Sequence, residues 1–103
     1  MSAERIEIVV RDEWNNPHMI EVALSHGFGV HRMIHDRTLW AVTHLPTRLV
    51  AVGDVKNARR AHMIACRLAS LGLDWTFTDP TAVKSFPNYL LAHIAELHTW
   101  GKT

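Results

Sequence analysis

Residues 38–75, TLWAVTHLPTRLVAVGDVKNARRAHMIACRLASLGLDW, contain the clearest structural pattern of the chain. Residues 38–44 alternate between two faces, as a strand does, and they are rich in β-branched and aromatic side chains. Pro46 interrupts this alternation at a position where proline favours a turn. Residues 49–52 resume the extended pattern, which predicts a β-hairpin over residues 38–52 that ends at Gly53.

A helical pattern follows the hairpin directly. Asp54 is the expected N-cap, because its carboxylate can accept the free N–H groups of a first helical turn. Gly72 is the expected stop. Small and apolar residues recur between them on one helix face: Ala58, Ala61, Ile64, Ala65, Leu68 and Leu71. Such an alanine-rich face predicts a helix that packs closely on a sheet.

The segment before the hairpin carries three further signals. Residues 4–11 alternate and predict a half-exposed strand, and Trp14 in the loop that follows is expected to cover the core. Asn16 followed by Pro17 is typical of a helix start, so a short helix is expected over residues 17–26. Residues 28–35 alternate again and predict a strand.

The segment after the hairpin and helix predicts three short elements. Residues 73–78 alternate as a final strand would. Asp79 followed by Pro80 predicts a helical turn, and a terminal helix should then end at Gly101. The resulting order is β-α-β-β-β-α-β-α in a single α+β domain over residues 1–103. Its antiparallel sheet would have three to five strands with helices packed on it, depending on whether the outer strands join.

Composition supports one core and an intracellular setting. A chain of 103 residues with 48% hydrophobic content suits a single domain. Its one cysteine, Cys66, excludes an intramolecular disulfide. The first residues contain no hydrophobic signal region, and no apolar run is long enough to span a membrane. We therefore expect a cytoplasmic location without membrane association.

Charge is distributed unevenly along the chain. The net charge is −3 over residues 1–27, +5 over residues 28–72 and −1 over residues 73–103, within a total of +1. The basic middle predicts a binding surface on the outer face of the helix and at the hairpin turn. Its candidate residues are Arg48, Lys56, Arg59, Arg60, Met63 and Arg67.

This surface predicts a non-enzymatic binding protein with a protein partner, since Met and Arg are enriched at protein interfaces. A nucleic-acid-binding module that uses the same cations on phosphates is the first alternative. The overall charge is low for such a protein. A homodimer is also possible, because the acidic first part of one copy could pair with the basic middle of another.

The eight histidines raise a third alternative, a small metal-binding or hydrolytic protein. Their spacing is poor for this purpose. His31 and His35, for example, would lie about 13 Å apart along a strand. The chain has no HExxH or CxxC motif and no phosphate-binding glycine loop. We therefore expect no catalytic residue, no metal and no cofactor.

Residues 40–47, WAVTHLPT, resemble a W-x-V-T-H-x-P-T hairpin of small, mostly uncharacterised phage and prophage proteins. In those proteins a glycine often follows the threonine, whereas this chain has Arg48. The resemblance extends over residues 40–75. It implies a phage-type accessory protein or inhibitor that engages a host factor, and it supplies no catalytic residues.

Overall fold

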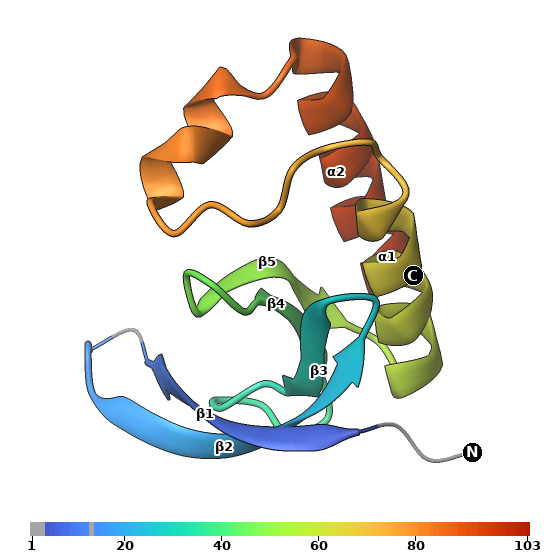
Figure 1. Cartoon of the computed structure of the whole chain (residues 1–103). Coiled ribbons are helices and arrows are strands. Elements are labelled where there is room, and N and C mark those ends of the chain that lie inside the picture. Colours follow the sequence, from blue (N-terminus) through green and yellow to red (C-terminus); the bar gives the residue numbers. More distant parts are fainter. Residues whose placement is uncertain (1–3, 13) are drawn as a thin grey trace.

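One antiparallel sheet followed by helices forms the structure, a computed structural model that describes residues 4–12 and 14–103. Each strand pairs with the next one along the chain (Figure 1). The strands are β1 (Arg5–Arg11), β2 (Pro17–Ser25), β3 (Phe28–Arg32), β4 (Trp40–His44) and β5 (Leu49–Val55). They precede helix α1 (Ala58–Ala69), the 3₁₀ helix η1 (Pro80–Ser85) and helix α2 (Asn88–Lys102). The predicted α+β class, with an antiparallel sheet and packed helices, is confirmed.

Helix α1 packs its alanine-rich face on the sheet, as the sequence predicted. Ala61, Ile64 and Leu68 are fully buried there. The small side chains allow α1 to lie close to the strands, and the larger ones fill the space between them. The core between helix and sheet consists of Phe28, Val30, Val42, Val52, Val55, Ala61, Ile64, Ala65 and Leu68.

The start of α1 differs from the prediction, because β5 is longer than expected. It continues past Gly53 to Val55, so Asp54 belongs to the strand. Asn57 is the N-cap instead, and its side-chain oxygen accepts the N–H of Arg60 at 2.9 Å. Asparagine and aspartate cap helices by the same hydrogen bond. The hairpin over residues 38–52 is thus confirmed in outline, with its second strand extended.

The opposite face of the sheet is also buried, because the sheet curls on itself and brings β1 and β2 around to it (Figure 1). Ile8, Val10 and Val22 form a second core there, against which Leu45 packs. Two register shifts between β4 and β5 mark irregularities of the kind that bend a strand. The central strands β3 and β4 therefore present no open face.

A buried histidine lies on this inner face. His31 Nδ1 donates to the carbonyl of Arg32 at 2.8 Å, and its Nε2 accepts the hydroxyl of Thr43 at 2.6 Å. Burial lowers the pKa of His31 below its usual value. The ring is therefore held neutral, with both nitrogens satisfied by the protein.

The helix predicted over residues 17–26 is wrong, since this segment is strand β2. It pairs with β1 along its length, with Ile8 opposite Ile20 and Arg11 opposite Pro17. The apolar residues of the segment fit a period of 3.6 and a period of 2 about equally, and pairing with β1 selects the second. His26 and Gly27, with φ of 52° and 86°, then form a two-residue hairpin turn into β3.

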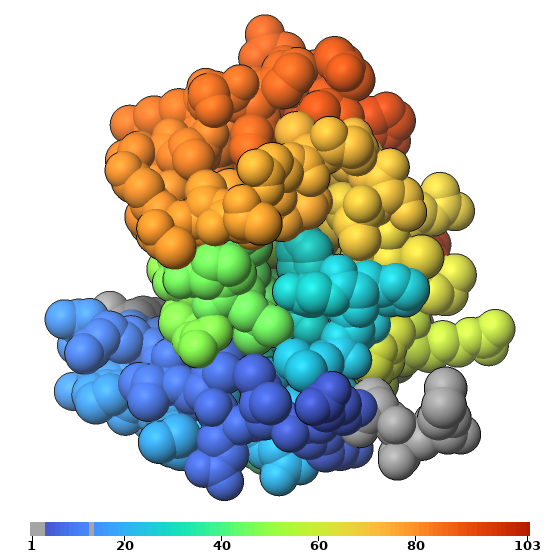
Figure 2. All heavy atoms as spheres, in the orientation of Figure 1, coloured from blue at the N-terminus to red at the C-terminus, as the bar shows by residue number. Residues whose placement is uncertain are grey.

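The strand predicted over residues 73–78 is also wrong. This segment is extended but lies outside the sheet, and its side chains attach it instead. Trp75 packs edge-on against Phe28, with ring centroids 5.0 Å apart, and its Nε1 donates to the carbonyl of Leu68 at 2.9 Å. Phe77 stacks on His44 at 4.4 Å. The space-filling view shows this part of the chain lying over the β4–β5 region (Figure 2).

The helical turn and the terminal helix predicted for the C-terminal part are confirmed, but the predicted end of that helix at Gly101 is wrong. Asp79 caps η1, where its carboxylate accepts the N–H of Thr81 at 3.0 Å. The terminal helix is α2, although Gly101 lies within it rather than after it. Gly101 is buried against Ile64 and Val55, where a larger side chain has little room. Among the described residues, no helix is long and apolar enough to cross a membrane.

Candidate functional site

Two of the predicted site residues, Lys56 and Arg60, hold the end of α2. Arg60 Nη1 donates to the carbonyl of Trp100 at 2.8 Å, and its guanidinium lies 5.1 Å from the centre of the Trp100 ring. Lys56 Nζ donates to the carbonyl of Thr103 at 3.2 Å. Cations are stabilising at the C-terminal end of a helix, where carbonyl groups lack partners. These two side chains therefore have a structural role.

Three predicted residues, Arg59, Met63 and Arg67, are exposed on α1. Met63 and Arg67 line a shallow hollow of about 440 Å³ between α1 and α2, together with Leu97 and Trp100. The predicted basic face is therefore divided. Lys56 and Arg60 bind the end of α2, whereas Met63 and Arg67 border the hollow between the two helices.

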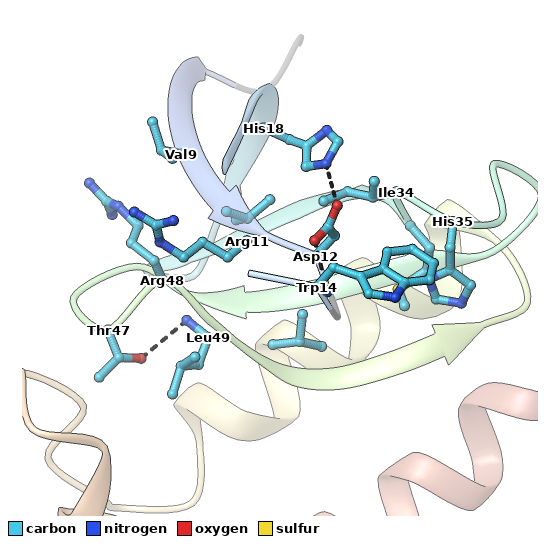
Figure 3. Close-up of a pocket in the computed structure, with 13 residues that line it drawn as sticks. Val9, Arg11, Asp12, Trp14, His18, Ile34, His35, Thr47, Arg48 and Leu49 are labelled. Atoms are coloured by element: carbon cyan, nitrogen blue, oxygen red, sulfur yellow. Dashed lines mark hydrogen bonds and ion pairs between the residues drawn. The ribbon is translucent and has the colours of Figure 1, made fainter. Parts of the chain in front are cut away.

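The sixth predicted residue, Arg48, lies in the β4–β5 turn and lines a different and larger cavity. This cavity has a volume of about 760 Å³ and lies between the end of β1 and the start of β5 (Figure 3). Such a volume falls in the range of ligand pockets, which measure about 300–1,000 Å³. Its apolar lining comes from Val9, Val10, Met33, Ile34, Leu49 and Val50. We call it the β1–β5 cavity.

Exposed apolar side chains gather at the β1–β5 cavity. Trp14 is 73% exposed, Leu49 52%, Val50 46% and Val9 42%, and all four line it. The expectation that Trp14 covers the core is therefore wrong. Exposed apolar groups collected around one concavity are typical of a binding surface, whereas isolated ones are common on any protein.

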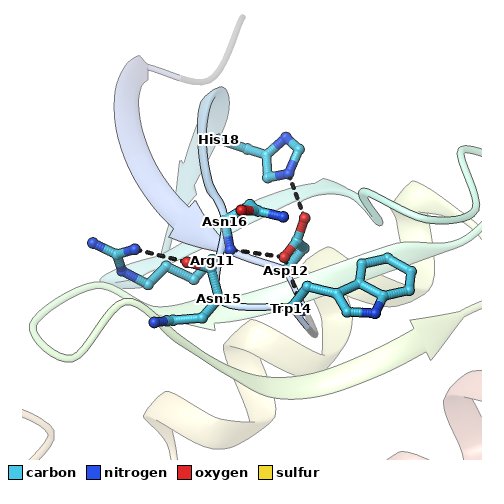
Figure 4. Close-up of polar contacts among 6 residues, drawn as sticks. All are labelled: Arg11, Asp12, Trp14, Asn15, Asn16 and His18. Atoms are coloured by element: carbon cyan, nitrogen blue, oxygen red, sulfur yellow. Dashed lines mark hydrogen bonds and ion pairs between the residues drawn. The ribbon is translucent and has the colours of Figure 1, made fainter.

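Asp12 organises the loop that carries Trp14. Its Oδ1 accepts the backbone N–H groups of Trp14 and Asn16, both at 2.9 Å, and its Oδ2 lies 2.8 Å from His18 Nε2 (Figure 4). The hydrogen bond from His18 and those from the backbone lower the pKa of Asp12. The carboxylate is therefore ionised at neutral pH and fixes the turn between β1 and β2.

Two arginines give the rim of the β1–β5 cavity a positive charge. Arg11 and Arg48 both line it, and their guanidinium groups lie on the same side of its mouth (Figure 3). Each donates one hydrogen bond to a backbone carbonyl, Arg11 to Asn15 and Arg48 to Leu45. A guanidinium has five N–H donors, so both retain donors for a ligand. An apolar floor beside two arginines suits an apolar group that carries a carboxylate.

Two further histidines, His44 and His62, take separate structural roles. His44 is buried, donates from Nε2 to the carbonyl of Trp75 at 2.6 Å and accepts from the hydroxyl of Thr47 at Nδ1. His62 contacts the hydroxyl of Ser25 at 2.9 Å. Within residues 4–12 and 14–103, no group of three histidine, cysteine or acidic side chains could hold a metal ion.

Comparison of the chain with family models, with curated proteins and with solved structures finds no match. The candidate site therefore rests on geometry alone. Sequence reasoning found Arg48 but missed Val9, Arg11 and Trp14. The signal that could have found them is the alternation of apolar side chains every two residues in residues 17–25, which is typical of a strand. A strand there would pair with residues 5–11 and would place Trp14 in the loop of a hairpin.

Proposed function

We propose that the chain is a non-enzymatic binding protein that takes a protein partner at the β1–β5 cavity. The observation that carries this proposal is the collection of four exposed apolar side chains around one cavity whose rim holds Arg11 and Arg48. Tryptophan and arginine at the edge of an apolar surface are typical of residues that dominate protein interfaces. The resemblance to small phage proteins favours a host factor as the partner.

The helix surface is the weaker site for this partner. Lys56 and Arg60 donate hydrogen bonds to the end of α2, so a partner would have to compete with those bonds. Arg59, Met63 and Arg67 are left as a smaller surface beside the groove between the helices. The β1–β5 cavity, by contrast, has more volume and more exposed apolar area.

Site-specific photocrosslinking tests the proposal. A photoreactive amino acid replaces Val50 in the cavity or, as a matched control, Tyr89, which is 68% exposed on α2. We expect the first protein to crosslink to one host protein in host cells, and the second to give no such product. Crosslinking from position 89 alone, or from neither position, would contradict the proposal.

Charge reversal then separates the two surfaces. Arg48→Glu should reduce the crosslinked product about tenfold or more, because it replaces a rim cation with an anion. Arg59→Glu makes the same charge change on α1 and should leave the yield within about twofold, as is usual for a residue outside the contact. A larger loss of crosslinked product for Arg59→Glu than for Arg48→Glu would place the binding site on α1 instead.

Nucleic-acid binding remains a second candidate because of a third concavity. Arg5, Arg32 and Arg37 line a hollow of about 440 Å³ beside the start of α1. Two of these cations already have partners, since Arg5 pairs with Glu21 at 3.2 Å and Arg32 lies 5.0 Å from the Trp40 ring centre. If nucleic acid binds here, affinity for labelled DNA or RNA should fall steeply with salt, and Arg37→Glu should weaken it. Absence of binding at low salt would exclude this function.

A further inference from the structure

The outer edge of β1 presents a defined set of backbone groups. β1 is an edge strand of the sheet and pairs only with β2 among the described strands. The N–H of Leu24 donates to the carbonyl of Glu4 at 2.7 Å, and the N–H of Asp12 donates to the carbonyl of Asn16 at 3.0 Å. Hydrogen-bonded and non-hydrogen-bonded pairs alternate along an antiparallel ladder.

This alternation fixes which residues point their backbone groups away from β2. The even-numbered residues from Glu4 to Asp12 exchange hydrogen bonds with β2. Residues 5, 7, 9 and 11 therefore direct N–H and carbonyl groups to the outer edge. Pro17, which has no N–H, stands opposite Arg11, as a non-hydrogen-bonded position allows.

Val9 and Arg11 both line the β1–β5 cavity, and their outer backbone groups have no backbone partner among the described residues. The cavity is bordered on its other side by Leu49 and Val50 at the start of β5, the second edge strand. β1 and β5 run in the same direction because four antiparallel pairings separate them. A strand placed between them could run antiparallel to both.

We propose that the β1–β5 cavity binds an extended peptide segment, which adds as a strand to the outer edge of β1 and carries an acidic residue. This inference rests on the proposed function and specifies the partner. The backbone of the segment hydrogen-bonds to Val9 and Arg11. Alternate side chains enter the cavity and contact Leu49 and Val50, and a carboxylate meets Arg11 and Arg48.

The outer edge of β1, the apolar cavity beside it and the two arginines of the rim match this mode of recognition. Strand addition takes its affinity from main-chain hydrogen bonds and its specificity from pockets for alternate side chains. The cavity supplies such a pocket beside the free edge. Asp12 is already bonded to His18 and to two backbone N–H groups, so the arginines of the rim remain available to an incoming carboxylate.

A second copy of the chain is the rival occupant, and it fits less well. Antiparallel pairing of two β1 strands about Val9 would place Glu7 of each copy opposite Arg11 of the other. However, the inward side chains of β1, Ile8 and Val10, are buried in their own core. The second copy could therefore offer only its outward side chains and would leave the apolar cavity unfilled.

Selection from a random peptide display library against the full chain tests the proposal. We expect enriched sequences in which apolar residues alternate and an acidic residue recurs at one position. A labelled synthetic peptide of that sequence should bind about tenfold or more weakly to Arg48→Glu, while Arg59→Glu binds it normally. Helical or acid-free consensus sequences, or no enrichment, would overturn the proposal.

N-methylation of the same synthetic peptide tests the strand geometry without changing the protein. Methyl groups on one set of alternate amides should abolish binding, and on the other set should leave it within about twofold, because only one set faces β1. Val9→Pro removes an outer N–H that β2 does not use and should also abolish binding, whereas Val9→Ala retains that N–H and part of the affinity. Equal effects of the two methylated peptides would overturn strand addition.

Sedimentation analysis distinguishes the rival. A dimer that is disrupted by Glu7→Arg or Arg11→Glu and restored by the two changes together would assign the edge to a second copy and overturn the proposal. Binding of labelled single-stranded DNA that competes with the peptide and depends on Arg48 would overturn it as well. If photocrosslinking from position 50 succeeds while the peptide tests fail, the cavity still binds a protein, but not as an added strand.

Discussion

Replacement of Gly29 by alanine provides the sharpest test of how the sheet curls. Gly29 lies in β3 and faces the inner core, where an added Cβ would stand 3.1 Å from both Leu45 Cδ2 and Val22 Cγ2. Carbon atoms pack at about 3.5–4.0 Å, so both contacts are too short by about half an ångström. Leu45 can rotate away, but Val22 is fully buried and stiff at χ1. Overpacking of this kind costs about 1–3 kcal/mol, and we expect about 2 kcal/mol.

Thermal and urea unfolding measure this cost. A loss of about 2 kcal/mol should lower Tm by about 10 °C in a chain of this size. Gly53→Ala is the matched control, because a Cβ at Gly53 meets its neighbours at ordinary distances of 3.4–3.7 Å. Val22→Ala combined with Gly29→Ala should be more stable than the sum of the single changes predicts, by about 1 kcal/mol. A neutral Gly29→Ala, or strict additivity, would refute the close packing of Val22 and Leu45 against Gly29.

Three further predictions concern the helices and the buried histidine. Asn57→Ala should lower the free energy of unfolding by about 1 kcal/mol in urea titrations, because the side-chain oxygen of Asn57 caps α1. Arg60→Ala should speed amide exchange in the last turn of α2 by about fivefold or more, equivalent to about 1 kcal/mol, and Arg59→Ala should not. The lowered pKa of His31 means that the unfolded chain binds its proton more readily, so stability should fall as pH drops below about 6.5. His31→Gln should reduce that slope, and an unchanged slope would contradict the buried, neutral ring.

The hairpin and the helix over residues 38–75 could be predicted because local signals there agree with the tertiary structure. The alternation around Trp40, the turn at Pro46 and the spacing from Ala58 to Leu68 all point to the elements that form. Two segments could not be assigned in this way. The spacing of apolar residues such as Ile20 and Leu24 fits both a helix and a strand, and the pairing with β1 decides for the strand. Residues 73–78 alternate, but side chains rather than a ladder bind them to the domain.

The candidate site was only partly accessible to sequence reasoning. Arg48 stood out because it lies in a predicted turn within the most basic segment. Its proximity to Arg11 depends on the curl of the whole sheet, which no local pattern encodes. Lys56 and Arg60 looked like free surface cations because the partner that they bind, the end of α2, lies more than 35 residues away in sequence.

The attachment of residues 73–78 has a consequence for how order is measured in this protein. Within the described structure, their N–H groups make no hydrogen bond to another backbone group, yet Trp75 and Phe77 are fixed among aromatic rings. Deuterium uptake should therefore be rapid along this segment, as in an unstructured tail, except at Thr76, whose N–H donates to Asp74 Oδ1 at 2.9 Å. The fluorescence anisotropy of Trp75, measured in a variant that lacks the other three tryptophans, should instead show an immobilised indole. The two methods will assign opposite mobility to the same six residues, and both results will be correct for the atoms that each one observes.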